Sequence, residues 1–404
     1  MSEVSFKDKL KLKELELNAV LEITQAINNN LPENALYKIY DFTLRANLNV
    51  RKLALYVYDD EWNCKANYGT KQNFFKIKLG NDFRKLRSIT STDHCDVEEF
   101  DEFEYVIPVF HKSETLALVF VSEGNQDRQM YYASEFIQAL SNIIIVAIEN
   151  KKLARKQLEQ EAFRKELEIA SDVQQFLFPD DLPYGMRLKV EASYLPHDRV
   201  GGDYYDYIPI NKNQFLLCVA DVSGKGIPAA ILMSNFQASL RTLIRQTPNL
   251  TEIVKALNFQ VRESAKGEKF ITFFAAIYDH TLKTLVYVNA GHNPPILIRK
   301  QSEKIELLED GCTVLGMFEP LPFINEGFIT DLDEFLLFNY TDGLTETEND
   351  AGDEYGIDKL ISYLKDNHHK DLREIHQDVI VNLDNFKGNQ AYRDDITMLS
   401  CRID

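Results

Sequence analysis

The sequence has little cysteine and no long apolar run. Its 404 residues include five cysteines, at positions 64, 95, 218, 312 and 401, without a CxxC pair. This spacing argues against a disulfide framework and against a cysteine zinc site. The longest wholly aliphatic run, 143–148, is far shorter than a membrane span, and the first residues lack the apolar core of a signal peptide. We therefore expect a cytoplasmic protein with reduced thiols and no membrane contact.

Positive charge is also in short supply. Lysine and arginine number 45 against 63 aspartates and glutamates, which gives a net charge of −18. Such a balance argues against nucleic acid and anionic membranes as partners. An anionic substrate would need a local cation, which bound metal ions would supply. The hydrophobic content of 45% is that of an ordinary globular protein, and the length allows two or three domains.

One stretch, FLLCVADVSGKGIPAAILM at 215–233, combines a buried strand, a carboxylate and a glycine turn. The apolar strand ends at Asp221, the turn follows at 223–226, and a helix is expected from Ile227. A carboxylate in this position suits a metal ion held by hard oxygen ligands. Taken alone, however, an aspartate after a strand more often caps a turn.

The pattern recurs, which strengthens the metal interpretation. Asp203 lies in VGGDYYD, Asp342 follows the apolar strand 335–340, and Asp394 and Asp395 precede the strand that begins at 396. If the last strand is antiparallel to the others, these carboxylates gather at one end of the sheet. Aspartates without histidine or cysteine are typical ligands of Mg²⁺ or Mn²⁺. Two such ions about 3.5–4 Å apart activate water and clamp a phosphoryl group.

The chain divides into three regions by its patterning. Helices at 8–30, 33–46 and 134–149 enclose expected strands at 52–58, 64–68, 74–79, 105–110 and 115–122, which predicts an α/β domain over 1–150. Residues 141–176 lack glycine and proline, and their 3–4 apolar spacing favours a coiled-coil linker over 151–185 or, alternatively, a solvated single helix. Strands and helices over 186–404 predict a mixed sheet or sandwich with helices outside.

Residues 165–404 resemble the SpoIIE/RsbU-type branch of the metal-dependent, protein phosphatase 2C-like phosphatases. The motifs that carry the resemblance occur in the family's order: ELEIASDVQQFLFP (166–179), VGGDYYD (200–206), VADVSGKGIPAAILMS (219–234), NAGHNPP (289–295), TDGLTE (341–346) and RDDITM (393–398). The resemblance implies a β-sandwich flanked by helices, two Mn²⁺ or Mg²⁺ ions, and hydrolysis of phosphoserine or phosphothreonine. The fold class expected for the whole chain is thus α/β (α+β).

The resemblance also assigns roles to single residues. It implies that Asp221 bridges both ions and Val222 lends its carbonyl, while Asp203 lies beside the first ion. It implies further contacts from Asp342 and Asp394 to the second ion, with Asp395 either a further ligand or a supporting group. Around these ligands the candidates are Gly224, Gly343 and His292, the last as a general acid or, in our preferred interpretation, as a residue that fixes its turn.

Further side chains near these motifs have simpler interpretations. Arg199 and Lys225 are candidates for phosphate contact but are expected to be solvated, and Tyr204 and Tyr205 are expected to pack. Asp206 and Glu346 support the ligands or are simply exposed. No histidine–aspartate pattern supports Ser223 as a nucleophile.

The first domain resembles, more weakly, a GAF sensory domain, through its order of elements and through LEITQAINNNLPENALYKIYDF (21–42). Cys64 and Cys95 are candidates for a chromophore or redox role, but buried bystanders are the simpler interpretation. The resemblance also implies that the helix with Val173 and Gln174 acts as a switch. A dimeric sensor that twists the linker would then control the metal ligands.

Three functions follow from these observations. The first is a homodimeric, sensor-regulated serine/threonine phosphatase in signal transduction. By family resemblance its substrate is a phosphorylated STAS-domain anti-anti-sigma protein. The second is a catalytically silent scaffold that binds a STAS-domain partner, which the retained aspartates disfavour because a silent protein has no need of clustered buried charge. The third is a hydrolase of small phosphates. Phosphate release from a panel of phosphoproteins and small phosphates discriminates among them.

Overall fold

The computed structural model describes residues 6–48, 50–92, 100–111, 114–123, 130–300 and 304–404. The chain forms two compact units, Met1–Glu161 and Ala162–Asp404. The division falls within the helix α3 (Met130–Gln175), inside the region for which the sequence predicts a helical linker. Within the described residues, no helix combines the length and the apolar character that crossing a membrane requires.

The first unit is an antiparallel sheet with helices on one face. The sheet has the order β2-β1-β5-β4-β3, and the expected hairpin over 105–122 is confirmed as β4 and β5. Its elements are α1 (Phe6–Asn28), α2 (Glu33–Leu48), β1 (Val50–Asp59), β2 (Glu61–Tyr68), β3 (Thr90–Ser91), β4 (Tyr105–His111) and β5 (Glu114–Glu123). Leu53 and Leu55 of β1 face a core shared with α1, α2 and α3, whereas Ala54 and Tyr56 face the opposite side. This alternation is the period of two that a strand imposes.

The predicted strand at 74–79 is wrong. Phe74–Lys76 forms a short 3₁₀ helix instead, and a second one covers Asn81–Lys85. Phe74 is buried in an aromatic cluster on the sheet face opposite the helices, and the Tyr56 hydroxyl donates to the carbonyls of Phe74 and Ile77, both at 3.0 Å. Phe74, Ile77 and Leu79 therefore pack on the sheet without pairing with it, whereas Phe75 is exposed.

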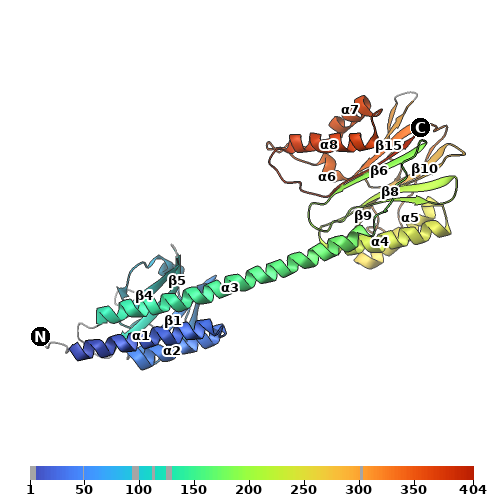
Figure 1. The fold of residues 1–404 in the computed structure, drawn as a ribbon. Helices are drawn as coiled ribbons and strands as arrows, with labels where there is room; N and C mark the ends of the chain where they lie inside the picture. The colour runs from blue at the N-terminus through green and yellow to red at the C-terminus, as the bar shows by residue number, and fades with distance from the viewer. Residues whose placement is uncertain (1–5, 49, 93–99, 112–113, 124–129, 301–303) are drawn as a thin grey trace. The chain divides into compact units, whose positions relative to one another are not determined.

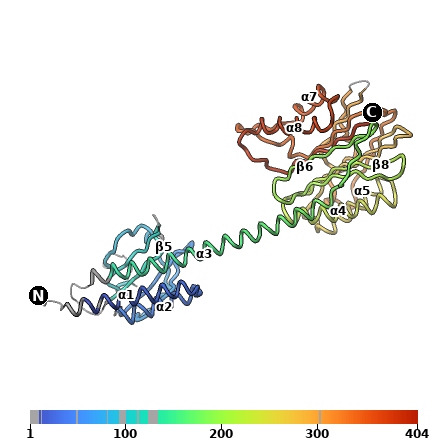
Figure 2. The backbone as a smooth tube through the Cα atoms, in the orientation of Figure 1, coloured from blue at the N-terminus to red at the C-terminus, as the bar shows by residue number. Residues whose placement is uncertain are grey.

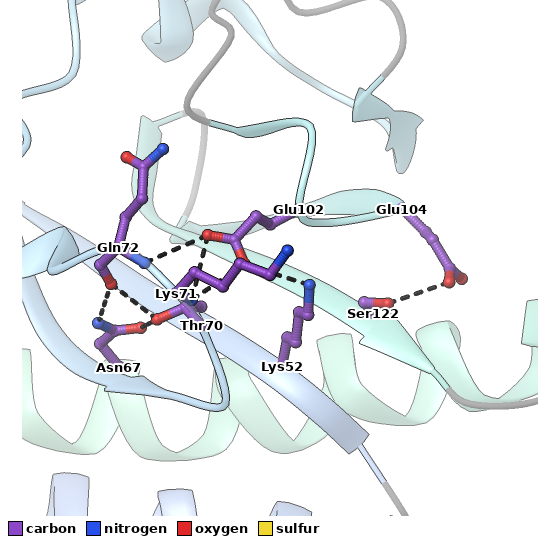
Figure 3. A network of polar contacts seen from close by, with 8 residues as sticks. All are labelled: Lys52, Asn67, Thr70, Lys71, Gln72, Glu102, Glu104 and Ser122. Atoms are coloured by element: carbon purple, nitrogen blue, oxygen red, sulfur yellow. Dashed lines mark hydrogen bonds and ion pairs between the residues drawn. The ribbon is translucent and has the colours of Figure 1, made fainter.

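A group of polar contacts around Glu102 joins separate segments of the first unit. The Glu102 carboxylate accepts hydrogen bonds from the backbone nitrogens of Lys71 and Gln72 and pairs with the Lys52 ammonium at 3.2 Å, as Figure 3 shows. These contacts tie the turn after β2 to the segment that leads into β4.

Cys64 does not have the environment of a reactive thiol. It is half-buried in the first unit, and burial raises the pKa of its thiol to about 12. A thiol with so high a pKa stays protonated, and the thiol form is neither a good nucleophile nor a redox sensor. The other candidate, Cys95, lies outside the described residues.

The second unit is a sandwich of two sheets. One sheet has the order β13-β10-β9-β8-β7, with β14 on β10, and the other has the order β12-β11-β15-β16-β6. The strands are β6 (Leu188–Leu195), β7 (Tyr204–Pro209), β8 (Gln214–Val222), β9 (Ile271–Asp279), β10 (Thr284–Ala290), β11 (Ile296–Arg299), β12 (Ile305–Leu307), β13 (Gly311–Cys312), β14 (Gly327–Ile329), β15 (Phe335–Tyr340) and β16 (Ile396–Ile403). Figure 2 shows the two sheets face to face, with β8 in one and β6 in the other.

Helices cover the outer faces of both sheets. The helices α4 (Ile227–Gln246) and α5 (Leu250–Ala265) lie on one side, and α7 (Ile357–Asn367) and α8 (Leu372–Lys387) lie on the other (Figure 1). Along β8, Leu217 and Val219 point into the core between the sheets, while Leu216 and Cys218 point into the core under α4 and α5. The expected sandwich with helices outside is thus confirmed, and the unbroken apolar run of β8 is explained by burial on both faces.

A buried histidine joins α8 to the sheet beneath it. His376 places Nδ1 2.9 Å from the Ser193 hydroxyl of β6 and Nε2 2.7 Å from the Ser400 hydroxyl of β16. Burial lowers the pKa of His376 to about 3. The folded protein therefore holds this ring neutral, whereas the unfolded chain protonates it below pH ~6.5.

This difference predicts a loss of stability in acid. The contribution of His376 is fully present above pH ~6.5 and is lost as the pH falls from 6.5 toward 3, because unfolding then takes up a proton. At pH 4.5 the loss amounts to about 2–3 kcal/mol at 1.4 kcal/mol per pH unit. We expect the free energy of unfolding of the second unit, measured in urea, to change less between pH 7.5 and 4.5 in His376→Gln than in the wild type. Equal slopes for the variant and the wild type would contradict the assignment.

Candidate metal centre

The sandwich brings its aspartates to one end of both sheets. Asp221 lies near the end of β8, and Asp203 immediately precedes β7, which pairs with β8. In the other sheet Asp342 follows β15 and begins the short helix α6 (Asp342–Thr345), while Asp394 and Asp395 precede β16. Since β15 and β16 are antiparallel, with Tyr340 opposite Met398, the end of one strand meets the start of the other. The last strand, β16, is thus antiparallel to β15, as expected. The strand that carries Asp221, β8, lies in the facing sheet and does not pair with them.

Asp203 is the most enclosed carboxylate of the group. Its Oδ2 accepts hydrogen bonds from the hydroxyls of Thr341 at 2.9 Å and Thr397 at 2.6 Å. Burial raises the pKa of Asp203, and the charges of Asp221 and Asp395 raise it further. The sequence analysis missed both threonines, although Thr341 directly precedes Asp342 and Thr397 lies two residues after Asp395.

The other carboxylates repel one another in the same way. Burial raises the pKa of Asp221, and the charges of Asp342, Asp394 and Asp395 add to the effect. The pKa of Asp342 is likewise raised by burial and by Asp394. Like charges at short range shift a pKa in this direction unless a cation compensates them. The centre therefore carries an excess of negative charge that a bound cation would relieve.

The donor chemistry fits Mg²⁺ or Mn²⁺, but the side chains do not form a closed ligand set. All four predicted catalytic residues offer carboxylate oxygens, which hard divalent cations prefer. Across the described residues, no three histidine, cysteine, aspartate or glutamate side chains are arranged so that they could hold a metal ion. Asp394 instead pairs with the Lys225 ammonium at 3.0 Å. A metal ion at Asp394 would thus have to displace this lysine.

Asp395 is engaged with the backbone of the loop that carries Asp203. Its Oδ1 accepts from the His197 amide and its Oδ2 from the Gly202 amide, each at 2.8 Å. Of the two roles left open for Asp395, these bonds favour the supporting one, in which it holds the loop in place.

Two glycines allow the backbone to approach closely at this point. A Cβ at Gly343 would lie 2.2 Å from the Asp395 carbonyl oxygen, and one at Gly202 would lie 2.9 Å from the Val222 carbonyl oxygen. Contacts this short exclude any side chain. The third glycine of interest, Gly224, has a φ of +90° in the turn after Asp221. The candidate support residues Gly224 and Gly343 therefore lie where the chain must bend or pack tightly.

His292 is buried and hydrogen-bonded through both its backbone and its ring. Its backbone nitrogen donates to the Asn289 side chain at 2.7 Å, and its Nδ1 lies 2.8 Å from the Thr272 hydroxyl. Thr272 pairs with Asp221 across β8 and β9, so the ring is near the carboxylates. Burial lowers the pKa of His292 to about 4, and its ring is therefore neutral at pH 7. The Asn289 side chain holds the turn, and Nε2 of the ring has no hydrogen-bond partner among the described residues, so the choice between turn support and a general acid stays a prediction.

Of the two interpretations left open for Asp206, simple exposure is wrong. Asp206 is fully buried and accepts two hydrogen bonds from Arg241 of α4, at 2.7 and 3.2 Å, and a third from the Tyr204 hydroxyl. Lys225 is exposed to solvent, as expected, and also pairs with Asp394. The Ser223 hydroxyl accepts the Phe270 amide at 2.9 Å, which is a structural contact. The sequence carried no signal for the partner of Asp206, because α4 meets β7 only in the folded chain.

The end of α3 contacts the same loop. Gln174 donates to the Gly201 carbonyl at 2.8 Å and accepts the Gly201 amide at 3.2 Å. Glu168, two turns earlier, pairs with Arg199 at 2.6 Å, so Arg199 is also not simply solvated. The helix therefore contacts the segment before Asp203 at two residues, Arg199 and Gly201.

Comparison with known proteins shows what this part of the chain is similar to. Residues 211–404 match the family model described as Stage II sporulation protein E (SpoIIE). Phosphoserine phosphatase RsbU of Bacillus subtilis is 31% identical over 205 residues, which cover 50% of this chain and 60% of that protein. Phosphoserine phosphatase RsbP of the same organism is 25% identical over 236 residues, which cover 57% and 56%. The matches thus span less than two thirds of these relatives.

A solved structure agrees in fold. The SiaA-PP2C domain of Pseudomonas aeruginosa superimposes with a TM-score of 0.54 at 22% identity, and the match covers 61% of this chain and 98% of that domain.

Proposed function

We propose that the chain is a metal-dependent serine/threonine protein phosphatase. Two findings support this function: residues 211–404 match the SpoIIE family model, and the chain shares the fold of a solved protein phosphatase 2C domain. The observation that carries this proposal is the gathering of aspartates from both sheets at one end of the sandwich. Burial and mutual repulsion raise the pKa values of Asp203, Asp221 and Asp342, which supports a bound cation at this site. A bound cation would remove this repulsion, whereas in its absence the buried carboxylates relieve it by taking up protons.

The ligands of two Mn²⁺ or Mg²⁺ ions would be the following groups: Asp203, Asp221, the Val222 carbonyl, Asp342 and Asp394, with Asp395 in support. Bound there, the ions would activate water and neutralise the phosphoryl oxygens. The chain's own part is orientation. Thr341 and Thr397 hold Asp203 in one rotamer through their hydroxyls. If Asp394 bound a metal ion instead of Lys225, the Lys225 ammonium would remain as a positive charge beside the site.

A panel of substrates tests this function. With full-length protein we expect Mn²⁺-dependent phosphate release from a phosphoserine STAS-domain protein, and EDTA should abolish it. A silent scaffold would instead bind the STAS-domain protein without releasing phosphate. A hydrolase of small phosphates would show a higher kcat/KM for p-nitrophenyl phosphate than for any phosphoprotein. Thermal stabilisation by Mn²⁺ gives a readout of the site that is independent of turnover.

We further propose that the chain is a homodimer joined through its first unit and α3. The exposed side of α3 carries two pairs of apolar residues eleven positions apart, Leu158 with Ile169 and Ala162 with Val173. An eleven-residue period gives a nearly straight, slightly right-handed pair of helices. On α1, Leu10, Leu17 and Leu21 form a second exposed stripe.

Control by the first unit would then pass along α3 to Gln174 and Gly201. Through these contacts a change in the helix would reach the loop that carries Asp203. By family resemblance the substrate would be a phosphorylated STAS-domain anti-anti-sigma protein, with neither nucleic acid nor membrane as a partner. Sedimentation of the full chain tests the dimer. By resemblance the first unit is a GAF-like sensor. Phosphate release by a shortened chain that starts near Leu153 shows whether this unit activates or inhibits the phosphatase.

A further inference from the structure

A lysine from the glycine turn between β8 and α4 reaches the aspartates across the sandwich. Lys225 places Nζ 3.0 Å from Asp394 Oδ2 and also donates to the Arg393 carbonyl. The turn follows a strand of one sheet, whereas Arg393 and Asp394 precede β16 of the other sheet. The ammonium group of Lys225 is thus brought by the fold to one of the proposed metal ligands.

The backbone on both sides of Lys225 is held in place. The Ser223 amide donates to the Phe270 carbonyl at 2.9 Å, and the Ser223 carbonyl accepts from the Lys269 ammonium at 2.8 Å. On the other side Gly226 caps α4 with a φ of +73°, a backbone conformation that side chains other than glycine rarely allow. The fold therefore determines where Lys225 leaves the turn, while its side chain, 45% exposed, has solvent beside it.

The positive charge of Lys225 acts on one part of the aspartate cluster. Burial and the charge of Asp394 raise the pKa of Asp342, and the charge of Lys225 opposes them. Among the residues that the structure describes, no lysine or arginine forms an ion pair with Asp203 or Asp221. The lysine thus compensates the ligands proposed for the second ion, Asp342 and Asp394, and not those proposed for the first.

An ammonium group and a divalent cation compete for the same carboxylate. An ion that binds to Asp394 has to break the ion pair with Lys225, and the ammonium then lies close to a second positive charge. Both costs fall on the second ion alone. Because both side chains of the pair are about half exposed, the pair is weak, so Lys225 lowers the affinity for the ion without excluding it.

We propose that Lys225 is an internal competitor of the second metal ion, so that the two ions bind with unequal affinity. This inference rests on the proposed phosphatase function and adds to it the order in which the metal site fills. At a metal concentration between the two affinities the chain holds one ion, whereas activation of water and clamping of the phosphoryl group use both. Lys225 therefore sets the metal concentration at which phosphatase activity begins.

Calorimetric titration of the full-length protein with Mn²⁺, at constant pH and ionic strength, tests this role without turnover. Lys225→Met keeps the apolar stem and removes the charge, and Lys225→Arg keeps the charge. We expect the weaker Mn²⁺ affinity to rise about 3- to 10-fold in Lys225→Met, and the tighter one to change less than about 2-fold. In Lys225→Arg both affinities should stay within about 2-fold of the wild type.

Activity gives a second readout, and a matched ion pair gives the control. The Mn²⁺ concentration for half-maximal release of phosphate from p-nitrophenyl phosphate should fall in Lys225→Met by the same factor as the Kd of the weaker ion. The control is Lys283→Met. Its pair with Asp333 has side chains 48% and 52% exposed, against 45% for each side chain of the Lys225 pair, and it lies near the opposite end of β9 from the aspartates. This variant should change neither Mn²⁺ affinity.

The failures of the two proposals are distinguishable. If the wild type binds no Mn²⁺ and releases no phosphate with it, the proposed metal-dependent phosphatase fails. If the wild type binds Mn²⁺ without releasing phosphate, catalysis fails, but the titrations still decide the role of Lys225. If Lys225→Met binds the same number of ions with the affinities of the wild type, or if the wild type binds both ions equally, Lys225 is not a competitor. A loss of stability of Lys225→Met in EDTA with unchanged Mn²⁺ binding would show that the pair only joins the two sheets.

Discussion

Replacing Asp221 with asparagine is expected to abolish phosphatase activity and, at the same time, to stabilise the metal-free protein. Activity should fall at least about 10³-fold, because the residue proposed to bridge both ions loses its charge. Without metal, Asp221 is repelled by Asp342, Asp394 and Asp395, which together with burial raise its pKa. An uncharged amide of the same size removes that repulsion, and we expect a gain of about 1 kcal/mol.

The two effects separate a metal site from a merely structural aspartate. In EDTA the unfolding midpoint of Asp221→Asn should lie a few degrees above that of the wild type. Added Mn²⁺ should stabilise the wild type by about 2.7 kcal/mol at 100 times its Kd and stabilise the variant much less. Asp333→Asn, at an exposed surface position, serves as the matched control and should change neither quantity. Destabilisation of Asp221→Asn in EDTA would count against the metal centre.

The largest loss of stability is expected from Asp206→Ala. The carboxylate of Asp206 is fully buried and accepts hydrogen bonds from Arg241, from the Tyr204 hydroxyl and from the Tyr207 amide. Its removal leaves a guanidinium and a buried hydroxyl without their acceptor. Breaking a buried pair in this way costs about 3–5 kcal/mol, and the partial exposure of Arg241 places the expected value near the lower end.

Urea unfolding of the second unit measures this loss. The matched control is again at Asp333, now as Asp333→Ala, because its ion pair with Lys283 has both side chains about half exposed. Exposed pairs contribute at most about 1 kcal/mol, so the control should lie close to the wild type. Asp206→Asn keeps the shape and some hydrogen bonds and should fall between the two. Equal losses at Asp206 and Asp333 would show that the buried network contributes little.

The pattern of β8 was sufficient to predict its burial and its end. An unbroken apolar run needs cover on both faces, and the chain supplies it with the second sheet on one side and with α4 and α5 on the other. The same reasoning failed at 74–79, where an apolar segment of similar length packs as a short 3₁₀ helix on the sheet. Local pattern records that side chains are buried, but it does not record whether the backbone pairs with a strand.

The site shows the same limit. Asp221, Asp342 and Asp394 were singled out because each stands where an apolar strand ends or begins, and Asp203 because it lies in the motif VGGDYYD. The direction of each side chain was not encoded locally. Asp394 turns to Lys225, and Asp395 turns to the amides of the loop before Asp203, since these partners come close only when the sheets stack.

Residue patterns alone predicted a sheet or sandwich with helices outside, a long helix in the region of α3, and aspartates at strand ends. These features depend on hydrophobic periodicity, on the absence of glycine and proline, and on residue types at strand termini, all of which are local. Only the tertiary structure decided that Asp206 is buried against Arg241, that Gln174 holds Gly201, and that Lys225 pairs with Asp394. Each of these depends on contacts between segments far apart in the chain, whose partners no local pattern specifies.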